Sequence, residues 1–229
     1  MLTANIPAAV ERIEDRTRDV RIITLAPRGP FAWRAGQYMQ IGADGFGSRS
    51  YSIASPPNDQ GHLVFHVRNM GGGLSAHLAQ NIKTGDLLNL HGPFGTMNTG
   101  LIEKRPVLMV AGGTGIAPML AMAEDIIKND LTGQITLVYG ARTLQDIYCR
   151  TELDRLETSG RVRLHIVTDP HTPDQHLRQL AADLREHVIY VSGPDPMMLP
   201  VHKALLELHA VSDRIFCDTD MNTLQKAAP

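Results

Sequence analysis

Hydrophobic and polar residues alternate in short runs over the first hundred residues, as they do along half-buried strands. The clearest run is 20–26, where Val20 and Ile22 alternate with Ile23 and Leu25 before the turn Pro27-Arg28-Gly29-Pro30. The expected strands are 9–14, 20–26, 37–41, 50–54, 63–68 and 87–91, and one helix, 74–82, interrupts them. Six short strands between glycine and proline turns predict a small antiparallel β-barrel.

The pattern changes after the polar connection 99–106. Val107 to Ala111 is a continuous apolar run, which is typical of a central strand in a parallel sheet. The expected strands are 107–111, 134–139, 162–168, 188–192 and 214–217, and the expected helices are 116–129, 151–159, one within 173–186, and 196–209. This alternation predicts an α/β domain with a five-stranded parallel sheet. We therefore divide the chain into two domains, 1–101 and 102–229.

Composition and charge exclude several classes of protein. Of 229 residues, 43% are hydrophobic and 20% charged, and the net charge of −2 gives no basis for bulk electrostatic binding to nucleic acid or anionic membranes. The N-terminus lacks the basic start and apolar centre of a signal peptide, and no apolar run is long enough for stable membrane insertion, so we expect a cytoplasmic location. Cys149 and Cys217 alone cannot hold an iron–sulfur cluster, and the histidines show no metal-ligand spacing.

The expected strand Arg49-Ser50-Tyr51-Ser52-Ile53-Ala54-Ser55 combines a cation, a phenol and small hydroxyls. That set suits a flavin. A guanidinium forks onto phosphate oxygens, a tyrosine ring packs against an isoalloxazine, and a serine hydroxyl reaches a ring nitrogen. The alternative is an ordinary barrel strand whose polar side chains face solvent.

Three glycines, Gly71 to Gly73, stand directly before the helix expected at 74–82. Glycines let backbone amides approach a ligand, and a helix N-terminus offers free N–H groups and the positive end of its dipole. Ser75 adds a hydroxyl. The segment predicts a pyrophosphate cradle, which favours FAD over FMN because only FAD has a pyrophosphate. The alternative is a flexible loop in which Ser75 starts the helix.

Two strand-to-helix turns in the second domain also carry glycines. Gly113-Thr114-Gly115 follows the first strand and matches the first half of a dinucleotide fingerprint, although Pro118 stands where the third glycine would be. Ser192-Gly193 follows the fourth strand. Because open parallel sheets bind ligands at the carboxyl ends of their strands, the two turns predict one nucleotide cleft.

The residues after the expected strand 134–139 do not decide between NADH and NADPH as the hydride donor. No acid closes that strand to hold ribose hydroxyls, since Asp146 comes several residues later. Arg142 could meet a 2′-phosphate or a pyrophosphate, or it could be a solvated surface residue. We expect that NADH is accepted and that NADPH is used to some extent.

Together and in this order, four segments resemble the ferredoxin–NADP reductase superfamily over about residues 10–218. They are Arg49-Ser50-Tyr51-Ser52, Gly72-Gly73-Leu74-Ser75, Ala111-Gly112-Gly113-Thr114-Gly115-Ile116-Ala117-Pro118 and Ser192-Gly193-Pro194-Asp195-Pro196-Met197-Met198. The resemblance implies a Greek-key flavin barrel followed by a nicotinamide-nucleotide domain. The short length and the missing cluster make the chain most similar to stand-alone flavin reductases and to the flavin modules of oxygenase reductases.

The resemblance also implies which residues form the sites. Flavin-binding residues would be Arg49, Ser50, Tyr51, Ser52, His66, Val67, Arg68, Gly72, Gly73, Leu74, Ser75 and Phe216. Nucleotide-binding residues would be Gly113, Thr114, Gly115, Arg142, Gly193 and Asp195. Ser52 and Ser192 would lie nearest the transferred hydride, as the catalytic pair.

The chain departs from the superfamily pattern at two places. Many members have a cysteine where Ser192 stands. Serine has a similar size but no thiol, which puts the rate of hydride transfer in question. The class of reaction is not affected. Members also often end with an aromatic residue near the flavin, and the tail after Phe216 has none. Either Phe216 takes that place, or Asp218 to Met221 cover the flavin face, or the face is open.

The leading expectation is an FAD-dependent NAD(P)H oxidoreductase. It would move a hydride from nicotinamide to flavin and then pass electrons to a small acceptor, such as free flavin, a quinone or a ferric chelate. One alternative is an electron-transfer subunit that serves an iron–sulfur, heme or oxygenase partner. Another, from a different class, is a nucleotide-binding regulatory module without turnover.

Overall fold

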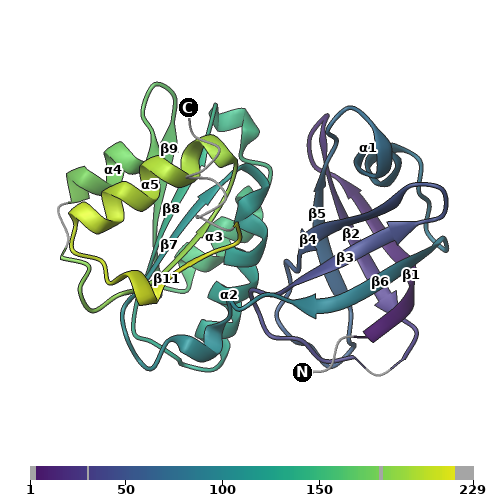
Figure 1. Cartoon of the computed structure of the whole chain (residues 1–229), viewed down its shortest axis with the longest axis horizontal. Coiled ribbons are helices and arrows are strands. Elements are labelled where there is room, and N and C mark those ends of the chain that lie inside the picture. The colour runs from purple at the N-terminus through teal and green to yellow at the C-terminus, as the bar shows by residue number, and fades with distance from the viewer. Residues whose placement is uncertain (1–3, 30, 181–182, 220–229) are drawn as a thin grey trace.

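The computed structural model describes residues 4–29, 31–180 and 183–219, which form two domains that lie side by side (Figure 1). The N-terminal domain is a six-stranded antiparallel sheet in the order β4-β3-β6-β1-β2-β5. Its strands are β1 (Ala4–Asp15), β2 (Val20–Pro27), β3 (Tyr38–Ala43), β4 (Gly47–Ser52), β5 (Leu63–Arg68) and β6 (Leu87–Phe94). A bridge between Ile53 and Phe65 joins the two edge strands, so the sheet is nearly closed and the expected barrel is confirmed.

Strand β4 lies further toward the N-terminus than the sequence pattern suggests. It pairs with β3 from Gly47 to Ser52, and the next residue, Ile53, bridges Phe65 of β5. Ile53 is fully buried with Phe65 in the barrel core, while its amide still donates to the Gln37 carbonyl oxygen at 3.0 Å, so this residue contacts both edges of the sheet. Helix α1 (Gly73–Gln80) follows β5 in the chain, contacts β5 and β4, and buries Leu74 and Leu78 in the barrel core.

The C-terminal domain has a five-stranded parallel sheet in the order β11-β10-β7-β8-β9, as the alternation of strands and helices predicts. Its strands are β7 (Val107–Gly112), β8 (Ile135–Ala141), β9 (Val162–Thr168), β10 (Val188–Ser192) and β11 (Ile215–Cys217). Its helices are α2 (Ile116–Lys128), α3 (Arg150–Thr158), α4 (Pro173–Leu180) and α5 (Asp195–Glu207). The chain reverses direction across the sheet between β7 and β10, which is where such sheets open a ligand crevice.

Helices cover both faces of this sheet, which explains the continuous apolar run in β7. Met109 and Ala111 pack toward α2 and α3, whereas Leu108 and Val110 pack toward α4 and α5. In Figure 1, α4 and α5 lie on the side away from the barrel, and α2 lies next to it. Within the described residues, no helix is both long and apolar enough to cross a membrane.

The two domains share a packed boundary. Val20, Ala35 and Met97 from the barrel side belong to the same buried cluster as the residues of α2. A Cβ atom added to Gly36 would lie 2.8 Å from Met122 Sδ, so the backbone there lies directly against α2. Near the connection between the domains, the buried Tyr190 hydroxyl donates to the Asn98 carbonyl oxygen at 2.8 Å. The boundary therefore has well-packed apolar contacts and hydrogen bonds at the connection.

Candidate functional site

A cleft of about 580 Å³ lies between the barrel and the carboxyl ends of β7 and β10. Most of the residues expected to bind flavin or nucleotide lie around it. It is lined by Arg49, Ser50, Tyr51, Ser52, His66, Arg68, Met70, Ser75, Gly112, Gly113, Thr114, Gly115, Ala117, Ser192, Gly193, Pro194 and Asp218. The structure thus brings together residues of all four segments that carry the resemblance, although these segments are far apart in the sequence.

Strand β4 supplies one wall of this cleft. Arg49 is exposed there, and among the described residues no carboxylate lies within ion-pair distance of it. The Tyr51 hydroxyl is buried and has no hydrogen-bond partner in the described part of the chain, and burial raises its pKa, against the opposing effect of Arg49. Buried polar atoms are nearly always satisfied, so the Tyr51 hydroxyl is a natural contact for a bound polar group.

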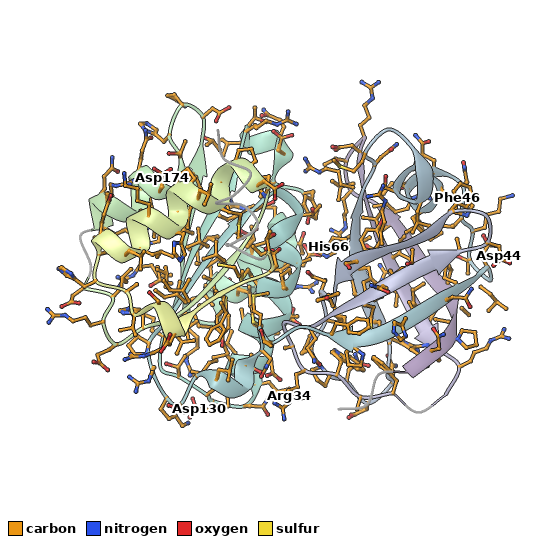
Figure 2. All side chains as sticks on the ribbon, in the orientation of Figure 1. Arg34, Asp44, Phe46, His66, Asp130 and Asp174 are labelled. Atoms are coloured by element: carbon orange, nitrogen blue, oxygen red, sulfur yellow. The ribbon has the colours of Figure 1, made fainter. Side chains whose placement is uncertain are left out.

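Strand β5 sends alternate side chains to the cleft and to the barrel core. Val67 is fully buried in the core, whereas His66 and Arg68 line the cleft. Figure 2 shows His66 on the side of the barrel that faces the second domain. Burial, reinforced by the charge of Arg16, lowers the pKa of His66 to about 3. His66 is therefore neutral at any ordinary pH.

The glycine-rich loop before α1 leaves open space next to its backbone. Gly71 and Gly73 have φ values of +85° and +58°, and Cβ atoms built at Gly71 to Gly73 would have no heavy atom within 4 Å. The Ser75 hydroxyl donates to the Gly72 carbonyl at 3.0 Å and accepts from the Met70 amide at 3.2 Å. Ser75 thus holds the loop in shape, while no side chain caps the helix start.

The two strand-to-helix turns of the second domain lie directly against each other. A Cβ atom on Gly115 would lie 2.2 Å from the Ser192 carbonyl oxygen, and one on Gly112 would lie 2.7 Å from Met197 Sδ. Gly113 has a φ of +56°. Glycines at these positions let the turns after β7 and β10 form one continuous wall of the cleft.

Ser192 is fully buried, and its hydroxyl donates a hydrogen bond to Asp218 Oδ2. Asp218 follows β11 and lines the cleft; the sequence predicted it only as part of the segment from Asp218 to Met221 that could cover the flavin face, and not as a partner of Ser192. Its position directly after β11, which pairs with β10, is the sequence feature that could have indicated a contact with Ser192. Because the Ser192 hydroxyl donates its proton to Asp218, the serine oxygen can only accept a hydrogen bond from a ligand in the cleft.

A second cavity of about 360 Å³ continues from the first across Arg68, Gly112, Gly113 and Pro194. Arg142 lines it, and so do two carboxylates, Asp146 and Asp169. The Asp146 carboxylate accepts hydrogen bonds from the Thr143 amide and hydroxyl. This cavity therefore combines one guanidinium with two acids, which sequence spacing alone did not place together.

Six of the expected site residues lie outside the lining of both cavities. Gly72 and Gly73 belong to the loop before α1, and of that motif only Ser75 lines the first cavity. Val67 and Leu74 are buried in the barrel core. Phe216 packs its ring on Tyr190, with centroids 5.7 Å apart, inside the second domain. Asp195 is exposed at the start of α5. Of the tail segment considered as a flavin cover, Asp218 lines the first cavity and residues 220 and 221 lie outside the described residues.

The described residues contain no group of three or more histidine, cysteine, aspartate or glutamate side chains that could hold a metal ion. Cys149 and Cys217 are free thiols, and burial raises the pKa of each to about 12.

Two parts of the chain match two different protein families. Residues 7–99 match the family described as oxidoreductase FAD-binding domain, and residues 109–203 match the family described as oxidoreductase NAD-binding domain. Among solved structures, the ferredoxin reductase in carbazole 1,9a-dioxygenase superposes with a TM-score of 0.85 at 27% identity, over 96% of this chain and 70% of that one.

Curated relatives include reductase components of oxygenase systems. Terephthalate 1,2-dioxygenase reductase component 1 of Comamonas sp is 32% identical over 87% of this chain and 63% of its own length. The ferredoxin–NAD(P)(+) reductase component of the naphthalene 1,2-dioxygenase system of Pseudomonas putida is 29% identical over 82% of this chain and 58% of its own length. The chain thus spans about three fifths of the length of these relatives.

Proposed function

Because this chain belongs to the ferredoxin–NADP reductase superfamily, we propose that it is a reductase that binds FAD on domain 1–101 and NAD(P)H on domain 102–229. The observation that carries the proposal is the shared cleft, in which Tyr51 and Ser52 of the barrel lie opposite Gly113 to Gly115 of the second domain. One cavity can therefore receive two cofactors from its two walls.

The residues of the barrel wall fit FAD. Arg49 has no competing ion pair among the described residues and would bind a phosphate. The open backbone of Gly71 to Gly73 would hold the pyrophosphate, and the unpartnered Tyr51 hydroxyl would be satisfied by the cofactor. When bound, FAD supplies the capacity to accept a hydride and release electrons. Val67 and Leu74 would act through their backbone, because their side chains pack in the core.

The residues of the second wall fit a nicotinamide nucleotide. The turn Gly113 to Gly115 would hold the phosphates, and the oxygen of Ser192 would accept a hydrogen bond from the carboxamide of the nicotinamide. Ser52 and Ser192 would flank the reacting centre, as proposed from the resemblance.

Both cysteines are free thiols, which supports the predicted cytoplasmic location.

The electron acceptor we propose is a redox protein of an oxygenase system, because the relatives are named as reductase components of such systems. This choice places the first alternative of the sequence analysis ahead of small diffusible acceptors. Within this chain the flavin would be the group that releases the electrons, because the chain's two cysteines are too few to hold an iron–sulfur cluster.

The function is tested by identifying the flavin and reducing it. We expect denaturation of the purified protein to release FAD, identified by mass, and anaerobic NADH to bleach its visible absorbance. Turnover with free flavin, quinone and ferric chelate should be much slower than this bleaching. Release of FMN alone would contradict the pyrophosphate site, and fast turnover of small acceptors would restore them to first place. A protein that cannot be reconstituted with any flavin would support the regulatory alternative instead.

Donor preference tests the assignment of Arg142. We expect NADH to be the better donor, because Asp146 and Asp169 in the same cavity repel a 2′-phosphate. Arg142→Ala should lower kcat/KM for NADPH by roughly tenfold, which corresponds to one charge-assisted contact, and should leave kcat/KM for NADH nearly unchanged. Steady-state kinetics with both donors check this. An equal loss of kcat/KM for NADH and NADPH would assign Arg142 to the pyrophosphate that both donors share. Unchanged kcat/KM for both would show that Arg142 is a solvated surface residue.

A further inference from the structure

The barrel holds one segment of the second domain at two points. His66 Nδ1 lies 2.9 Å from the Tyr148 hydroxyl oxygen, and Arg16 Nη2 lies 2.7 Å from Glu152 Oε1. Tyr148 and Glu152 belong to the stretch that leads from β8 into α3. Both contacts therefore position the same segment relative to the barrel.

The same segment forms part of the nucleotide cavity. Gly140, Ala141, Arg142 and Asp146 line that cavity, and Tyr148 follows only two residues later. On the other side of the hydrogen bond, His66 lines the cleft proposed to hold the flavin. One hydrogen bond thus joins the wall of the flavin cleft to the segment that shapes the nucleotide cavity.

The His66–Tyr148 contact joins two buried, neutral side chains. Both side chains are buried, at 7% and 6% exposure, and their rings meet edge-on with centroids 5.4 Å apart. Burial keeps His66 neutral and raises the pKa of Tyr148 well above its usual value. A neutral imidazole and a phenol form one directional hydrogen bond, so the contact sets both the distance and the orientation of the two walls.

Other hydrogen bonds between the domains lie at the connection instead of at the cleft. Tyr190 donates to Asn98 there, and Thr99 donates to Asp125. These contacts anchor the domains close to the chain crossing, whereas the contact at His66 is made by a side chain that lines the cleft. Hydride transfer requires reacting atoms about 3–3.5 Å apart, so a small change in that distance changes the rate strongly.

We propose that Tyr148 is a positioning residue for the reaction, acting through His66 to fix the second domain against the flavin cleft. The inference rests on the proposed function, because it assumes flavin in that cleft and nicotinamide opposite it. Tyr148 itself contacts neither cavity among the described residues. Its effect should therefore appear in the rate of transfer and not in the affinity for either cofactor.

The test compares Tyr148→Phe with Tyr190→Phe. Each change removes one buried hydroxyl that bonds across the domain boundary, but only Tyr148 does so through a side chain that lines the cleft. Tyr148→Phe should lower the stopped-flow rate of flavin reduction at saturating NADH by roughly three- to tenfold, the effect of one hydrogen bond. FAD content and the Kd for NADH should stay within twofold of the parent. Tyr190→Phe should keep the parental rate.

A second readout does not depend on turnover. NAD+ added to the oxidised protein should perturb the visible absorbance of the flavin, and we expect this perturbation to be smaller in Tyr148→Phe only. Thermal unfolding of both variants controls for stability. A parental rate and spectrum in Tyr148→Phe, or equal slowing in Tyr190→Phe, would overturn the inference while leaving the reductase assignment intact. A parent protein that NADH does not reduce would overturn the proposed function and this inference with it.

Discussion

Gly115→Ala is expected to abolish NADH-dependent reduction while the barrel still binds flavin. The new Cβ atom would lie 2.2 Å from the Ser192 oxygen, 2.4 Å from its carbonyl carbon and 2.7 Å from the Gly193 nitrogen. These are backbone atoms, so no side-chain rotation relieves the clash, and the turns after β7 and β10 must move apart. Overpacking usually costs about 1–3 kcal/mol of folding stability, and a backbone clash belongs at the upper end.

The larger effect of this substitution should fall on catalysis. Both turns line the cleft, and a displacement of about 1 Å near reacting groups can cost about a hundredfold in rate. We expect kcat/KM for NADH to fall by more than about a hundredfold, while FAD content and reduction by dithionite persist.

Gly133→Ala is the matched control. An alanine Cβ there would have no heavy atom within 4 Å, and Gly133 lies on an exposed loop between α2 and β8. Its kcat/KM and unfolding free energy should match those of the parent. Near-parental kcat/KM in Gly115→Ala would show that the two turns do not form the nicotinamide wall.

Most strands and helices could be predicted from the sequence, because hydrophobic residues recur with a period that differs between strands and helices and is visible within each element. Strands β5, β9 and β10 have the bounds that their patterns predict, since turn residues stop each run within one or two positions. Helix α1 begins within one residue of its prediction, at the last glycine of the run from Gly71 to Gly73. The continuous apolar run of β7 predicted a strand covered on both faces, and two separate buried clusters confirm it.

The candidate site could be predicted only as far as its motifs are continuous in the sequence. Glycine turns and the strand from Arg49 to Ser52 are local, and the structure brings them to one cleft. Pairings such as His66 with Tyr148, 82 residues apart, and Arg16 with Glu152, 136 apart, leave no local trace. They depend on how one domain packs against another, which no periodicity encodes.

Side-chain direction set the other limit on prediction. A motif names a stretch of backbone, but alternate residues on a strand point to opposite faces. Val67 therefore enters the barrel core although it lies between two residues that line the cleft. Phe216 likewise packs on Tyr190 inside the second domain, because β11 lies at the edge of the sheet beside β10.

Arg49→Ala is expected to weaken FAD binding by about ten- to a hundredfold with little change in folding stability. Arg49 is exposed on β4, and no ion pair ties it to another described residue, so its removal costs the fold little. A charge-assisted bond to phosphate contributes about 1.5–3 kcal/mol, which gives the expected loss of affinity.

The measurement is titration of flavin-free protein with FAD and with riboflavin, followed by flavin fluorescence. Riboflavin has no phosphate, so parent and Arg49→Ala should bind it equally, and the loss should appear with FAD alone. Increasing salt should reduce the difference in FAD affinity between the parent and Arg49→Ala, because ionic screening weakens an exposed contact between charges. Arg28→Ala, which removes an exposed arginine on the turn after β2, outside the cleft lining, should bind both ligands as the parent does. An affinity loss shared by riboflavin would mean that Arg49 supports the ring site or the fold, and unchanged FAD binding would remove Arg49 from the site.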